Sequence, residues 1–428
     1  MRLLAAILVT AATGAAASVL DAQTPTPSAA DIARAKRVLS TTPLIDGHND
    51  LPWVIRESRT APHDVEAYDL RKKTPGMTDL DRLKKGMVGA QFWSIYIPGE
   101  IKDSGYARVQ LEQFDIARRV IAKYPERLQW ALTSDAIRST FKAGKIGSLL
   151  GLEGGHAIEN SLGALRVYYD LGARYMTLTH NVTLDWADAA LDSAKHGGLT
   201  PFGKEVVREM NRLGMLVDLS HVSPGTMSAA LDVTEAPVIF SHSGSRALVN
   251  HPRNVPDSIL ARLPKNGGVV MVPFVTVFTS AAVNADDDSL NAVAAAAARR
   301  HPGDTTAARA EVAAWRAAHP RPKATIGDVA DVIDHVRKVA GVDHVGIGSD
   351  FDGITENVVG LEDVSTYPAL FAELARRGWS DADLAKLASG NVLRVLEQAE
   401  AVSARLKKSR PASNATIQQL DGLQRPTP

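Results

Sequence analysis

The chain has 428 residues with 48 basic and 48 acidic side chains, so its formal net charge is zero, and hydrophobic residues make up 45% of it. These values describe a globular protein of one large domain or two ordinary ones, and they argue against nucleic-acid binding, which normally shows as a basic excess or stripe. The sequence contains no cysteine. Disulfides, thiolate metal ligands and a cysteine nucleophile are therefore excluded.

The first residues have the pattern of a secretory signal peptide. Arg2 precedes an apolar run over residues 3–19, and Ala15 and Ala17 follow the A-x-A cleavage pattern. A membrane anchor is the alternative, but the run is interrupted by threonine and glycine and is shorter than the roughly 20 residues that span a bilayer. We predict that residues 1–22 are removed and that the mature protein is periplasmic or secreted, without a stable membrane anchor.

Eight short apolar runs with strand character follow along the chain. They are residues 44–46, 88–96, 146–153, 175–180, 215–220, 238–241, 269–274 and 345–349. Helical patterns lie between most of them, for example at residues 107–123, 164–171, 203–213 and 225–232. Strand alternating with helix indicates a parallel sheet, and eight such units predict an α/β fold of the (β/α)8 TIM-barrel type. An open doubly wound sheet is the alternative, but no G-x-G-x-x-G fingerprint follows an early strand.

One segment interrupts the alternation of strand and helix. Residues 284–323 are Ala-rich and charged, and alanine and arginine favour helix strongly. We predict a helical insertion between the seventh strand and the eighth. The barrel domain is expected at residues 23–400, closed by a helix over 382–399. A polar tail follows at 401–428, without the hydrophobic segment of a lipid-anchor signal.

Five of the strand-like runs end in side chains that commonly bind metal ions. These side chains are His48 and Asp50 in LIDGHND, Glu153 in IGSLLGLEGG, His221 in MLVDLSH, His242 in PVIFSH and Asp350 in HVGIGSD. In a parallel barrel the carboxyl ends of all strands open at one mouth, where barrel enzymes carry their chemistry. The pattern therefore predicts a two-metal hydrolase.

Each of these residues alone is a weak indication of a metal site, but together they support one another. His48 and Asp50 are two apart on an extended strand, so both side chains can point toward one ion. Glu153 precedes two glycines and could bridge two cations, although a glutamate in a glycine turn is often simply exposed. His221 and His242 could each be a hydrogen-bonded core histidine. Their position at successive strand ends favours ligands.

Nitrogen and carboxylate donors without sulfur suit zinc best, and manganese or cobalt can substitute. Two ions about 3.5 Å apart would hold a hydroxide between them, lower its pKa toward neutrality and polarise the carbonyl to be cleaved. The sequence alone therefore favours hydrolytic chemistry at a pair of ions.

Seven motifs occur along residues 44–396 in an order that is specific to one family. They are LIDGHNDLPW, GLEGGH, TLTHN followed by WAD, VDLSHVS, FSHSGSRAL, HPRNVPD and GIGSDFDG. Together they resemble the membrane dipeptidase (renal dipeptidase) family of zinc peptidases. The resemblance implies an amidohydrolase-type barrel with two Zn²⁺ ions per chain that cleaves dipeptides, often with a D-residue at the C-terminal position. Some members also open β-lactam rings, and a homodimer is suggested by resemblance alone.

The resemblance also implies roles for single residues. His48 and Asp50 match ligands of the first zinc, Glu153 matches the carboxylate that bridges both ions, and His221 and His242 match ligands of the second zinc. The expected reaction is attack of a metal-bridging hydroxide on the peptide carbonyl.

Three further residues match positions that handle the substrate. His180 corresponds to a histidine that contacts the substrate and steadies the oxyanion, and Arg253 to an arginine that binds the substrate's carboxylate. Asp350 corresponds to the aspartate that moves a proton between water and leaving amine, with Asp352 as the competing choice. Where some members carry a substrate-binding tyrosine, this chain has Phe278, so carboxylate recognition is expected to depend more on Arg253.

Two rival functions stay open at this point. A related barrel amidohydrolase would act on N-acyl amino acids, lactones or cyclic amides. A periplasmic binding protein would not need two tightly held ions. A dipeptidase that recognises both free termini by charge should use longer peptides poorly.

Overall fold

The computed structural model describes residues 26–101 and 105–423, so the predicted signal peptide at residues 1–22 lies outside the described part. Within that part, parallel strands form one sheet in the order β2-β1-β9-β8-β7-β6-β5-β4-β3. A further pairing of β2 with β4 closes eight of these strands into a barrel. The predicted (β/α)8 fold is confirmed, and the open doubly wound sheet is excluded.

The strands lie close to the eight predicted runs. They are β1 (Leu44–Asn49), β2 (Val88–Ser94), β3 (Leu128–Trp130), β4 (Ile146–Glu153), β5 (Ala173–Thr177), β6 (Leu216–Asp218), β7 (Ile239–Phe240), β8 (Val269–Val272) and β9 (Val345–Ile347). The strand that the sequence did not predict is β3, which has three residues and pairs only with the first residues of β4. It is too short to show a periodic pattern.

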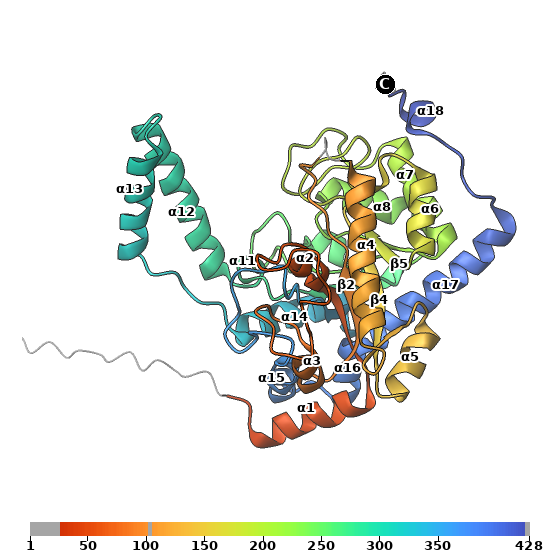
Figure 1. Cartoon of the computed structure of the whole chain (residues 1–428), viewed down its shortest axis with the longest axis horizontal. Helices are drawn as coiled ribbons and strands as arrows, with labels where there is room; N and C mark the ends of the chain where they lie inside the picture. Colours follow the sequence, from red (N-terminus) through yellow and green to blue (C-terminus); the bar gives the residue numbers. More distant parts are fainter. Residues whose placement is uncertain (1–25, 102–104, 424–428) are drawn as a thin grey trace, which may run out of the picture.

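Helices surround the barrel, and most of them pack against its outside (Figure 1). They are α1 (Ala29–Thr41), α2 (Leu51–Arg56), α3 (Leu80–Lys85), α4 (Tyr106–Lys123), α5 (Ser134–Lys142), η2 (Gly155–Ile158), α6 (Leu162–Asp170), α7 (Pro201–Leu213), α8 (Pro224–Val233), α9 (Asp257–Leu260), α10 (Leu263–Asn266), α11 (Thr276–Thr279), α12 (Ala281–Arg300), α13 (Thr305–Ala318), α14 (Ile326–Ala340), η3 (Val342–His344), α15 (Tyr367–Arg376), α16 (Asp381–Ala385), η4 (Lys386–Gly390), α17 (Asn391–Ser409) and α18 (Ile417–Asp421). Local sequence sets their ends. In α7, for example, Thr200 caps the first turn, Pro201 follows it, and Gly214 ends the helix in the left-handed conformation.

The core has two layers because neighbouring strand residues point to opposite faces. In β4, Leu150 belongs to the layer between the strands and the outer helices, whereas Leu149 belongs to the barrel interior. Val392 and Leu396 of α17 join that interior cluster together with Ile45, near the start of β1. Helix α17 therefore packs against the amino-terminal ends of the strands, which leaves the carboxyl-terminal ends open.

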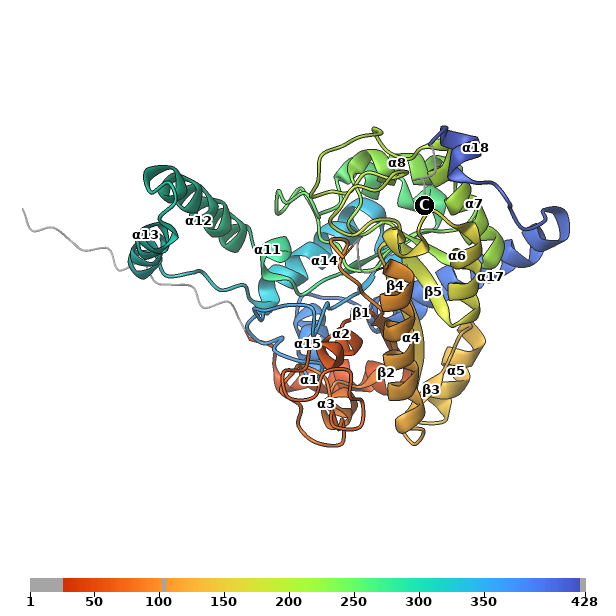
Figure 2. The same ribbon diagram turned by 45° about the horizontal axis from the view of Figure 1, so that its top comes forward.

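The predicted insertion between the last two barrel strands is the helix pair α12–α13. Figures 1 and 2 show this pair (teal) extending away from the barrel. In α12 the buried residues are Val283 and Ala297, and α13 buries none. The base of the pair is fixed by ion pairs, because Arg321, just after α13, contacts both Asp287 of α12 and Glu356 in the loop after β9.

The closing helix continues further than the sequence suggested. Helix α17 runs to Ser409, well past residue 399, and α18 follows within the segment expected to be a polar tail. Ile417 of α18 is buried, and Asp421 accepts hydrogen bonds from Thr200 Oγ1 at 2.6 Å and Phe202 N at 3.0 Å. In the described ranges, the helices are all too short or too polar to cross a bilayer.

Candidate metal centre

Six ligand-type side chains converge at the carboxyl ends of the barrel strands. His48 lies in β1 and Asp50 directly follows that strand, while Glu153 is the last residue of β4. His221, His242 and Asp350 follow β6, β7 and β9 within three residues. The five ligands predicted from sequence are therefore gathered at one mouth, together with the predicted proton carrier Asp350.

Glu153 lies at the centre of this group. Its Oε2 is 3.3 Å from His48 Nε2, whereas its Oε1 is 3.0 Å from His221 Nε2 and 3.6 Å from His242 Nε2. Ser94 Oγ donates a further hydrogen bond to Oε2 at 3.0 Å. Burial alone would raise the pKa of Glu153, but the neighbouring His48 and His221 bring it well below its usual range. An ionised carboxylate thus presents one oxygen to each side of the site.

Three overlapping sets of side chains can each hold an ion, with ligand atoms within 4.8 Å of one another. The sets are His48, Glu153 and His242; Glu153, His180 and His221; and His48, Asp50 and Asp350. Because the sets share Glu153 or His48, ions held by them would be close neighbours. Nitrogen and oxygen donors without sulfur fit zinc and related divalent metals.

Each of the three ligand-type histidines contacts a polar neighbour through Nδ1. The contacts are His48 with the Tyr175 hydroxyl at 2.8 Å, His221 with Asn181 Oδ1 at 3.0 Å, and His242 with Ser241 Oγ at 2.8 Å. A proton on Nδ1 leaves the Nε2 lone pair free for a metal. His48 Nε2 is buried without a hydrogen-bond partner, and the Nε2 atoms of His221 and His242 are 2.8 Å apart. These donors fit a cation.

The charges of the histidines agree with this arrangement. Burial, reinforced by the positive charge of Arg253, holds the pKa of His221 and of His242 well below the usual histidine value. Both effects favour the neutral ring, which is the form that binds a metal ion. Burial also disfavours the charged form of His48, but Tyr175 and the carboxylates of Glu153 and Asp50 raise its pKa well above the usual value. A cation binding among these carboxylates would displace that proton.

Backbone strain accompanies the site. His221, Asp350 and Asp352 adopt φ angles of 66°, 67° and 67°, in the left-handed region that favours glycine. Such conformations cost on the order of 1–3 kcal/mol each and persist where the surroundings fix them. The Asp350 N–H, for example, donates to the His48 carbonyl oxygen at 3.1 Å.

Asp350 and Asp352 lie in different surroundings. Asp350 shares a possible ion site with His48 and Asp50, and its pKa is raised well above normal by burial and by the negative charges of Asp50 and Glu153. Asp352 Oδ1 instead accepts a hydrogen bond from Met77 N at 2.6 Å, which ties this carboxylate to the turn before α3. Burial raises the pKa of Asp352 to about 6.

His180 and Arg253, the two residues predicted to handle the substrate, line a cavity together with Glu153 and Asp350. His180 Nε2 lies 3.9 Å from Glu153 Oε1, and its ring centroid is 4.4 Å from that of His221. Arg253 is only 2% exposed, and its Nη1 has no hydrogen-bond partner. Its guanidinium lies 5.3 Å from the ring centroid of Phe278, and burial lowers its pKa to about 10. A charged, buried N–H without an acceptor is suited to bind a carboxylate.

The cavity above these residues has a volume of about 770 Å³. Its walls include apolar side chains, among them Trp53, Leu191 and Phe278. Asp287 and Arg321 also line it, so the α12–α13 insertion contributes to the site. This contribution was not predictable from the sequence, because the direction in which the insertion leaves the barrel depends on ion pairs between remote segments.

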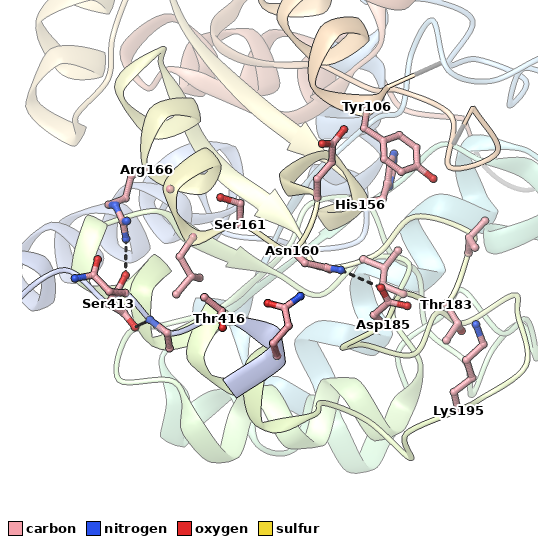
Figure 3. Close-up of a pocket in the computed structure, with 18 residues that line it drawn as sticks. Tyr106, His156, Asn160, Ser161, Arg166, Thr183, Asp185, Lys195, Ser413 and Thr416 are labelled. Atoms are coloured by element: carbon pink, nitrogen blue, oxygen red, sulfur yellow. Dashed lines mark hydrogen bonds between the residues drawn. The ribbon is translucent and has the colours of Figure 1, made fainter. Parts of the chain in front are cut away.

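A second cavity of about 750 Å³ is shown in Figure 3, and the loop after β5 forms part of its wall. Val182 to Asp185 of this loop line the second cavity, whereas His180 and Asn181 line the metal-site cavity. In the described part of the chain, each set of side chains that could hold an ion includes residues that line the first cavity.

Comparison with known proteins identifies the family. The model of the membrane dipeptidase family, peptidase family M19, matches residues 32–410, which is most of the chain. The chain belongs to the membrane dipeptidase family. Its predicted resemblance is thereby confirmed, and the protein is a metallopeptidase that hydrolyses dipeptides.

Solved structures agree with this membership. The chain is similar to the probable dipeptidase PvdM from Pseudomonas aeruginosa, at 26% identity and a TM-score of 0.75, covering 87% of this chain and 99% of that one. It is also similar to dipeptidase AC, a metallopeptidase of family M19, at 25% identity and a TM-score of 0.69, covering 84% of this chain and 99% of that one. A Rhodobacter sphaeroides metallopeptidase, solved with a phosphinate mimic of L-Ala-D-Ala, shares the fold. Its sequence identity is 24% and its TM-score is 0.69, and the match covers 84% of this chain and 99% of that one.

Proposed function

We propose that this membrane dipeptidase family member uses two Zn²⁺ ions to cleave dipeptides whose free ends are recognised by charge. The observation that supports this most strongly is the position of Glu153, whose two oxygens face His48 on one side and His221 and His242 on the other. His48 and Asp50 would hold the first ion, His221 and His242 the second, and Glu153 would bridge them.

When bound, two Zn²⁺ ions would supply the positive charge that activates a water molecule, polarises the peptide carbonyl and keeps Asp350 ionised. The chain's own residues supply the proton transfer. Asp350, which lies with His48 and Asp50, accepts the water's proton and delivers it to the leaving amine. We assign this role to Asp350 rather than Asp352, because Asp352 is occupied by Met77 N.

Arg253 and His180 are assigned to the substrate. The unpartnered Arg253 Nη1 would bind the dipeptide's carboxylate, which fixes the position of the peptide bond in the cavity. His180, beside Glu153 and His221, would donate a hydrogen bond to the carbonyl oxygen as negative charge develops there. The phosphinate mimic of L-Ala-D-Ala in the Rhodobacter relative supports a substrate with a C-terminal D-residue.

The decisive experiment combines metal analysis with a substrate panel. We expect two zinc ions per purified chain and hydrolysis of L,L and L,D dipeptides, with tripeptides and N-acyl amino acids cleaved much more slowly. Preference for N-acyl amino acids over dipeptides would contradict the proposal and favour a related amidohydrolase. A single ion at full activity would contradict the two-ion site.

We also propose that the protein is exported to the periplasm or secreted. The support is the signal-like sequence of residues 1–22. Sequencing the amino terminus of the mature protein should show a start near residue 23, and a retained Met1 would contradict export with cleavage.

A further inference from the structure

A fully buried carboxylate lies beneath the metal-site cavity and takes no part in the reaction proposed above. Asp218, the last residue of β6, is 0% exposed and accepts four hydrogen bonds. Ser220 N and Ser241 N donate to Oδ1 at 3.1 and 2.8 Å, and Thr177 Oγ1 and Ser241 Oγ donate to Oδ2, both at 2.6 Å. Burying a carboxylate costs free energy even when it is fully hydrogen-bonded, so its presence here suggests a function.

The hydrogen bonds lead from Asp218 to a metal-type ligand. Since Ser241 Oγ–H donates to Asp218, that oxygen is left to accept a hydrogen bond, and His242 Nδ1 lies 2.8 Å from it. Nδ1 of His242 therefore carries the ring proton, and Nε2 presents its lone pair toward Glu153. The chain of contacts fixes both the tautomer and the orientation of the ring.

His242 differs in this respect from the other two ligand-type histidines. In the described hydrogen bonds, Nδ1 of His48 meets a tyrosine hydroxyl and Nδ1 of His221 meets an asparagine amide oxygen. Only the contact of His242 continues through a hydroxyl to a carboxylate. Asp218 also accepts a hydrogen bond from Thr177 of β5. The position of the His242 ring therefore depends on contacts from three adjacent strands, β5, β6 and β7.

We propose that Asp218 and Ser241 are positioning residues that hold His242 for one ion of the pair and set that ion's affinity separately from the other's. The inference rests on the two-zinc function proposed above. Loss of a carboxylate that is hydrogen-bonded to the second ring nitrogen of a metal-binding histidine, directly or through another group, typically lowers metal affinity or activity about 10–100-fold. Loss of the contact should therefore weaken one ion and leave the ion at His48 and Asp50 nearly unchanged.

The test uses Ser241→Ala in the full chain, with Ser243→Ala as the matched control. Ser243 is equally buried and lies two residues from Ser241, but its hydroxyl donates to Ser220 Oγ at 3.1 Å, and none of its described hydrogen bonds involves a histidine ring. Metal-stripped protein is titrated with Zn²⁺ in competition with a chelator, and thermal unfolding without metal reports on folding. We expect Ser241→Ala to bind one ion as wild type does and the other about 10–100-fold more weakly. Ser243→Ala should bind both as wild type does.

Two further variants distinguish loss of the hydrogen bond to His242 from a general folding defect. Ser241→Thr keeps the hydroxyl and should restore the second affinity, and Asp218→Asn should weaken the same single ion. Unchanged binding of both ions by Ser241→Ala would overturn the inference while leaving the two-zinc function intact. Equal weakening of both ions would overturn it too, because it would indicate a general structural role. If wild type itself bound fewer than two ions, the two-zinc function would fail and this inference with it.

Discussion

The two large cavities of this protein have nearly the same volume, about 770 and 750 Å³, yet they differ in how their polar groups are used. In the second cavity the polar groups pair with one another. Arg166 donates to Ser413 O, and Asn160 donates to Asp185 (Figure 3). In the metal-site cavity, by contrast, the buried donor Arg253 Nη1 has no hydrogen-bond partner. The two cavities are therefore distinguished not by their volume but by clustered ligand-type side chains and a buried cationic group without an acceptor.

The largest effect is expected from Glu153→Ala, which removes the carboxylate at the centre of the first cavity. Both ions should be lost or greatly weakened, and kcat/KM should fall by about 10³-fold or more, because several kcal/mol of transition-state stabilisation disappear. Metal content and dipeptide hydrolysis are measured together. Glu159→Ala is the matched control, since Glu159 lines the second cavity and should leave both quantities unchanged.

Removing the metal should produce a loss of similar size without any mutation. Treatment with a strong chelator should abolish dipeptide hydrolysis, and added Zn²⁺ should restore it. Zinc at about 1,000 times its dissociation constant should also stabilise the folded chain by about 4 kcal/mol, seen as a higher Tm. Glu153→Ala should show little of this rise. Full activity after removal of all metal would contradict the assignment of the first cavity.

A smaller loss is expected from Asp350→Asn, which keeps the shape of the side chain but removes its ability to carry the proton. We expect two bound ions, a nearly unchanged KM and a kcat lower by about 10²–10⁴-fold. Asp352→Asn should retain most of the turnover, because Asp352 contacts Met77 N instead of the ion site. The reverse outcome, with Asp352→Asn the slower variant, would transfer the proton role to Asp352.

Arg253→Ala should act mainly on binding. Losing a charged hydrogen bond of about 1.5–3 kcal/mol corresponds to a rise in KM of about 10–150-fold, with a smaller effect on kcat. A dipeptide amide, which lacks the carboxylate, provides the control. It should be a poor substrate for wild type and should be cleaved equally by the variant. Equal sensitivity of both substrates to the mutation would rule out carboxylate recognition.

The sequence predicted the barrel and the ligand-type side chains that converge at its mouth, because both depend on local pattern. The eight-residue run of β4 was located at its true bounds, and each ligand-type residue stands next to an apolar strand. The supporting contacts were not predictable, since they depend on how strands align. Tyr175, for example, reaches His48 only because Gly151 on the neighbouring strand has no side chain. A Cβ there would lie 2.0 Å from the tyrosine ring.

The smallest effect is expected in the second cavity. Lys195 is exposed at its wall, so Lys195→Ala should change stability by no more than about 0.5 kcal/mol and kcat/KM by no more than about twofold. The same loop, however, carries His180 and Asn181 into the metal-site cavity. A kcat/KM lowered tenfold, with both ions retained, would therefore mean that the second cavity influences the first through this loop. The two cavities could then no longer be treated as independent, and the loop after β5 would be the element that couples them.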